Sequence, residues 1–278
     1  MMSTELALDI DWSRTAWPQA DGYDTQAILE LSGWRPRPVG DAPSLFGGRV
    51  AVRHRAEGGL PGPKYQPAPL DHTNLAEAER ILGAWPEALA QAGALLDEIQ
   101  PWIDTSIPEN ARAIPGSSSH SEGDEFGTIM LTADHPFGTA QAIVHEMAHH
   151  KLRALGVQIM SASRIVGNDP AARYTSPIIT DRKRPMTAVL HAQYSFMHVT
   201  VLDVAVYNAM PALREQAVFL LSRNVPRMEG GREEIAEHLE IADAAGEAFM
   251  DAFNRWSDAT LAAGRAILDA EGYGLPEL

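Results

Sequence analysis

TAQAIVHEMAHHKLRAL, residues 139–155, has the pattern of a long buried helix. Apolar residues recur at every fourth position within it, which is the repeat of one face of a helix. These are Ala140, Val144, Ala148 and Leu152. Gly156 follows directly and is a typical C-terminal cap. Residues 126–132 are apolar and β-branched, so they predict a strand that leads into this helix.

Residues 145–149 form the motif His-Glu-x-x-His. Residues four apart lie one turn apart on one helix face, so the imidazoles of His145 and His149 can bind one metal ion. Glu146 can reach a water on that metal and is the candidate catalytic residue. Burying these groups in an apolar stretch is costly without a partner, and this favours a metal site over a solvated polar face.

A third ligand must come from elsewhere, because two residues of one helix rarely complete a metal site. A second strong helix is predicted over residues 186–208, after a long connection at residues 157–185. His191 leads this helix and is the candidate third ligand. The reserve candidates are His198, seven residues on and on the same face, and then Glu215 and Glu237.

A basic cluster lies just before His191 in an otherwise acidic chain. Arginine binds carboxylates through two parallel hydrogen bonds. Arg182 and Arg184 are therefore candidates for holding an anion near the metal. A solvated loop with scattered charges explains the cluster equally well.

The rest of the chain predicts an α+β fold that is mainly helical with a small β-sheet. Residues 1–70 are rich in proline and glycine, so we expect an N-terminal arm or loops packed on the body, with a short helix over residues 24–31. Residues 71–278 form the mostly helical metal-binding catalytic domain. Its first helical pattern runs from residue 74 to about Ile99 and is broken at Pro86. Further helices end near Glu271.

Composition limits the classes of function. The chain has 278 residues, no cysteine, and a net charge of −15 from 37 acidic and 22 basic residues. The lack of cysteine excludes disulfides, cysteine-ligated zinc and iron–sulfur clusters. The acidic excess repels phosphate backbones, so nucleic acid is not an expected partner. With no secretory signal and no apolar run of about 18 residues, we expect a cytoplasmic protein without a membrane span.

Several segments also match the pattern of a known family. They are FGTI at 126–129, VHEMAHHKL at 144–152, SP at 176–177, RPM at 184–186, VLHA at 189–192 and YSF at 194–196. Over roughly residues 125–200 the chain resembles the HExxH proteins of peptide natural-product biosynthesis, described as α-ketoglutarate-dependent peptide β-hydroxylases. It departs from them at Ile178 and Ile179, where the family has an aromatic and a basic residue, and at Ala192, often glycine there.

The resemblance implies an oxidoreductase, a dioxygenase that hydroxylates a β-carbon of a residue in a peptide, such as a ribosomally made precursor. It implies Fe(II) as the metal, with His145, His149 and His191 as ligands. The cosubstrate α-ketoglutarate would chelate the iron, with Arg184 or Arg182 at its distal carboxylate. Dioxygen would use a remaining position, and open positions are what such chemistry requires of a protein.

Two alternatives stay open. The first is a zinc metallopeptidase in which Glu146 acts as general base. One extended peptidase motif is absent, because Leu152 and Leu155 occupy its glycine and last histidine positions. The second is a non-catalytic, metal-stabilised protein. That would need a closed site of four ligands, and the sequence offers no obvious fourth.

Overall fold

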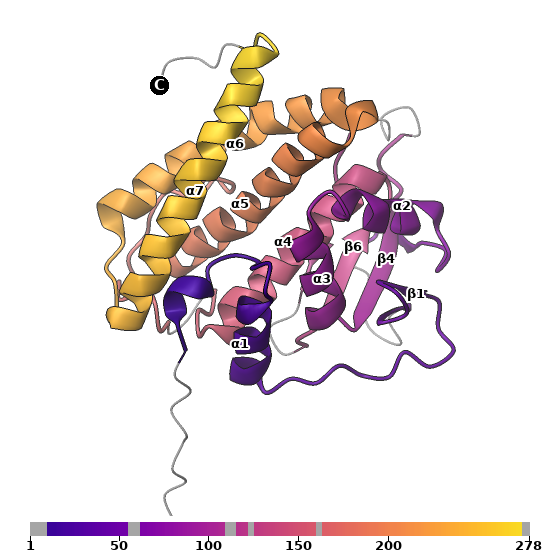
Figure 1. The fold of residues 1–278 in the computed structure, drawn as a ribbon, viewed down its shortest axis with the longest axis horizontal. Helices are drawn as coiled ribbons and strands as arrows, with labels where there is room; N and C mark the ends of the chain where they lie inside the picture. The colour runs from indigo at the N-terminus through magenta and orange to yellow at the C-terminus, as the bar shows by residue number, and fades with distance from the viewer. Residues whose placement is uncertain (1–9, 55–61, 109–114, 122–124, 160–162, 274–278) are drawn as a thin grey trace, which may run out of the picture.

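Helix α4, Pro136–Ala154, lies between a small sheet and a bundle of long helices (Figure 1). The computed structural model describes residues 10–54, 62–108, 115–121, 125–159 and 163–273. Helices and a mixed sheet make this an α+β fold, and α4 and the strand before it agree with the sequence prediction. None of the described helices is long and apolar enough to cross a membrane.

In the described residues the sheet has six strands, in the order β1-β2-β4-β6-β5 with β3 also paired to β4. β2, β4 and β6 run parallel, whereas β1, β3 and β5 each pair antiparallel with a neighbour. The strands are β1 Ser44–Leu45, β2 Val50–Val52, β3 Tyr65–Pro67, β4 Glu98–Asp104, β5 Ser119–His120 and β6 Thr128–Thr132. All residues of β6 are buried, so β6 anchors the start of α4 in the core.

Strand β4 corrects the prediction that the helical pattern extends to Ile99. Helix α3 ends at Leu95, and residues 98–102 pair with β6 in parallel register. Pro101 lies inside this central strand, where a missing N–H normally breaks the ladder. On that edge β2 pairs only as far as Ile99 and β3 begins at Trp102, so the missing donor falls in the gap between them.

The helices follow the predicted spacing more closely. α1 agrees with the helix expected over residues 24–31, and Pro86 begins α3, as expected for proline at a first helical position. The remaining connection, at residues 163–185, holds only isolated bridges. The helices are α1 Tyr23–Ser32, α2 Thr73–Leu82, α3 Pro86–Leu95, α5 Met186–Ala209, α6 Arg214–His238 and α7 Ala244–Ala270.

The first 70 residues contribute more regular structure than predicted. β1, β2 and β3 all lie in the main sheet, and α1 packs on α4. Asp24 of α1 forms an ion pair with Lys151 of α4 at 3.1 Å, and both side chains are fully buried. This segment is therefore part of the core that holds α4, although a domain boundary near residue 70 stays a prediction. Residues 1–9 and 55–61 lie outside the described residues.

Candidate metal centre

The start of α4 is fixed by a side-chain cap. β6 ends at Thr132, and His135 accepts hydrogen bonds from the backbone N–H groups of Phe137 and Gly138 through its Nδ1. Pro136 takes the first helical position, where its missing N–H costs nothing. The short link from strand to helix sets the rotation of α4, and with it the direction of the motif residues two turns further on.

His145 and His149 face each other on α4. Their Nε2 atoms lie 3.1 Å apart, and the rings meet edge to face. Ligand atoms of His145, Glu146 and His149 all lie within 4.8 Å of one another. Two nitrogens bound at about 2.1 Å to one ion lie roughly 3.0 to 3.4 Å apart at ordinary coordination angles. The spacing of the two imidazoles therefore fits a shared metal ion.

His191 lies against the other side of His149. Its Nδ1 is 2.9 Å from the Nδ1 of His149, and its Nε2 is 2.8 Å from the carbonyl oxygen of Val157. A carbonyl only accepts, so Nε2 of His191 carries the proton and its Nδ1 is an acceptor. His149 then donates from Nδ1, which leaves its Nε2 lone pair facing His145. The three predicted ligands are thus joined in one run, although His191 does not share the convergent group of His145, Glu146 and His149.

Burial keeps these imidazoles neutral. It lowers the pKa of His145 and of His149, and for His149 the nearby His145 and His191 add to the effect. Burial also lowers the pKa of His191 to about 3, although its bond to Val157 acts in the opposite direction. Metal ions bind the neutral form of imidazole, so at neutral pH little proton release opposes binding.

Glu146 is buried beside the run of imidazoles. Its side chain is 3% exposed, and its Oε1 lies 3.9 Å from the Nε2 of His145. Arg153, two turns further along α4, interacts electrostatically with Glu146. Arg153 also donates to the hydroxyl and carbonyl oxygens of Ser121. A buried carboxylate at this position can orient a ligand or act as a base.

The two arginines proposed for the cosubstrate differ in position. Arg184 is half-buried just before α5, and its backbone pairs with Tyr174. Its charge is among those that lower the pKa of His191. Arg182 is exposed. Of the two, Arg184 is the one whose charge acts on the imidazole run.

The reserve ligands do not join the group. His198 is buried in α5, where its ring contacts Trp85 and Trp256 and its Nδ1 donates to the carbonyl of Tyr194. Glu215 and Glu237 are exposed near the two ends of α6. Within the described residues, the convergent group holds only His145, Glu146 and His149.

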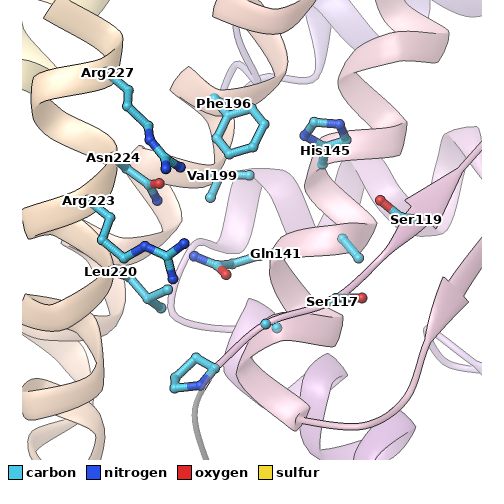
Figure 2. Close-up of a pocket in the computed structure, with 14 residues that line it drawn as sticks. Ser117, Ser119, Gln141, His145, Phe196, Val199, Leu220, Arg223, Asn224 and Arg227 are labelled. Atoms are coloured by element: carbon cyan, nitrogen blue, oxygen red, sulfur yellow. The ribbon is translucent and has the colours of Figure 1, made fainter. Parts of the chain in front are cut away.

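A cavity of about 320 Å³ opens beside His145 (Figure 2). His145 and Gln141 of α4 line one side, and Arg223, Asn224 and Arg227 of α6 line the other. The sequence does not predict the α6 residues, because nothing in their local pattern indicates that α6 packs on α5 and lines the same cavity as α4. The only available signal was a pair of arginines four residues apart in an acidic chain.

Comparison with models of known protein families gives no match, and comparison with curated proteins gives none either.

Proposed function

We propose that this protein is an Fe(II)- and α-ketoglutarate-dependent oxygenase that hydroxylates a β-carbon of a residue in a peptide. The observation that carries the proposal is the run of three imidazoles, His145, His149 and His191, at the contact of α4 and α5. A donor set of neutral imidazoles suits iron as well as zinc. The sequence resemblance over residues 125–200 favours iron, and its segments lie in or next to β6, α4 and α5, which build this site.

In this proposal His145 and His149 hold the metal through Nε2. His191 would be the third ligand through Nδ1, which its bond to Val157 leaves unprotonated, or would act through His149, whose Nδ1 donates to it in this structure. Bound Fe(II), together with α-ketoglutarate, supplies the activation of dioxygen that hydroxylation of carbon requires. Glu146 positions His145 and needs no proton transfer of its own. The cavity beside His145 receives the peptide side chain.

The cosubstrate needs a cation for its distal carboxylate, and Arg184 is the candidate. Arg184 is half-buried, and its charge acts on His191. Of the three imidazoles, His145 lines the cavity and His191 does not. This arrangement separates cosubstrate from peptide along the three imidazoles. A cytoplasmic location and a ribosomally made precursor as the substrate are part of the same proposal.

A zinc metallopeptidase is the second candidate. The position of Glu146 favours it, because its carboxylate lies 3.9 Å from the Nε2 of His145 and can act as a general base toward a water on the metal. In that case the cavity would bind a side chain next to the scissile bond.

Anaerobic titration of metal-free protein with Fe(II), with and without α-ketoglutarate, tests the proposal. Bidentate binding of the keto acid to iron gives a weak visible absorption band, and we expect that band only when both are present. His149→Ala, checked for folding by circular dichroism, is the control and should not give it. If no band forms and the wild type instead retains Zn(II) tightly, the peptidase becomes the better account.

A further inference from the structure

Two arginines face the cavity beside His145, and neither has a carboxylate partner among the described residues. Arg223 and Arg227 lie one turn apart on α6, and both are exposed. Figure 2 shows them extending from α6 on the side of the cavity opposite His145. Within the described part of the chain, neither side chain forms an ion pair or a hydrogen bond. The guanidinium of Arg223 lies over the ring of Phe219.

Two acidic groups on or against α6 pair with other arginines. Glu229, two residues after Arg227, binds Arg265 of α7 through both carboxylate oxygens. Arg232, further along α6, pairs with Asp258. Although the chain has a net charge of −15, no described residue pairs with these two guanidinium groups at the cavity. This local concentration of positive charge attracts an anion.

The other polar groups of the cavity wall are fixed by a buried carboxylate. Asp203 of α5 accepts one hydrogen bond from the Nε2 of Gln141 at 2.6 Å and one from the Nδ2 of Asn224 at 2.9 Å. It therefore ties α4, α5 and α6 together behind the cavity. Since the amides each direct an N–H toward Asp203, the guanidinium groups of Arg223 and Arg227 supply the charged donors to a ligand. A pair of arginines suits the planar carboxylate.

We propose that Arg223 and Arg227 bind a carboxylate of the substrate, the acidic side chain of a peptide residue, and so hold that residue beside His145. A volume of about 320 Å³ is at the lower end for ligand pockets, and fits one side chain better than a folded segment. The cosubstrate has its own candidate cation in Arg184. The inference rests on the proposed function for what happens at the metal, but carboxylate binding does not require the metal.

A peptide titration of metal-free protein tests this, followed by NMR at low salt. The probes are acetyl-Ala-Asp-Ala-amide and its neutral Asn counterpart, with α-ketoglutarate and inorganic phosphate as further arms. We expect the wild type to bind the Asp peptide about tenfold more tightly than the Asn peptide, and Arg223→Gln and Arg227→Gln each to lose most of this preference. Arg255→Gln makes the same charge change at an exposed site on α7 and should keep it.

Equal affinity of the wild type for both peptides would overturn the proposal. Loss of α-ketoglutarate binding alone in the arginine variants would also overturn it, because the pocket would then belong to the cosubstrate. Tighter binding of phosphate than of the Asp peptide would overturn it as well. His149→Ala separates this failure from that of the proposed function. It should lose the metal and retain the preference for the Asp peptide, because the two arginines act without the metal.

Discussion

The Nδ1 atoms of His149 and His191 lie 2.9 Å apart, and His191 is held in place by the carbonyl of Val157. Val157 follows the end of α4, so this bond ties the connection after the motif to α5. His191 can act on the metal as a ligand or through His149, by fixing the tautomer of that ring. Either role makes the metal site depend on a residue 42 positions away from His149.

Replacement of His191 by alanine should weaken metal binding at least tenfold, because loss of an orienting partner costs about 10- to 100-fold and loss of a ligand costs more. Competition with a chromophoric chelator measures the affinity. The control is His198→Phe, which removes an imidazole from the same helix but keeps an aromatic ring among Trp85 and Trp256. His191→Ala with unchanged affinity would exclude both roles for His191.

Glu146→Gln should keep the metal and retain succinate formation from α-ketoglutarate to within about tenfold of the wild type. A general base that is lost costs about 10² to 10⁴ in rate, so a peptidase would lose its activity. Succinate assay and release of fragments from casein measure the two activities on the same preparation. Loss of peptide cleavage from an active wild type would contradict the oxygenase assignment.

His198→Phe should make the protein less sensitive to acid. Burial holds the pKa of His198 well below its usual value, so as pH falls below about 6.5 the unfolded chain takes up a proton that the folded chain refuses. The stability due to neutral His198 is present above that pH and is lost on acidification. Urea unfolding at pH 7, 6 and 5 measures the unfolding free energy. Its slope against pH should be smaller in the variant by about 1.4 kcal/mol per pH unit. If the variant had the same slope as the wild type, His198 would not be a source of the acid sensitivity.

Gly138→Ala should disturb the cavity wall. A Cβ at this position of α4 would lie 2.2 Å from the carbonyl oxygen of Gly116, a backbone atom that lines the cavity. We expect a loss of about 1 to 3 kcal/mol in unfolding free energy. Gly230→Ala in α6 is the matched control, because nothing lies within 4 Å of its Cβ, and should be stabilising by about 0.5 to 1 kcal/mol. Equal effects in urea unfolding would contradict the close approach of Gly116 to α4.

The sequence predicts the elements whose signals are local. Each of these signals lies within the helix that it predicts. They are the four-residue repeat of α4, the apolar run of α5 from Met186 and the proline that begins α3. Strand β4 has no such signal. It contains Pro101, which has no N–H for a neighbouring strand. β4 is central because β2 pairs with it up to Ile99 and β3 pairs with it from Trp102, so neither needs that N–H.

The same distinction applies to the site. The spacing of His145 and His149 on one helix face is local and agrees with the structure. The sequence predicts that a later helix supplies a further ligand and that His191 is the candidate. It does not predict the contact of His191 with His149. The sequence does not assign Arg223 and Arg227 a role, since the packing of α6 on α5 and α7 depends on apolar contacts distributed over the whole bundle.

Calorimetric titration of metal-free protein with Fe(II) under anaerobic conditions, and with Zn(II), measures whether His145 and His149 hold a metal ion. We expect one equivalent bound by the wild type and no measurable binding by the double variant His145→Ala/His149→Ala, with the fold of each checked by circular dichroism. A folded double variant that still binds one equivalent with the affinity of the wild type would contradict the account.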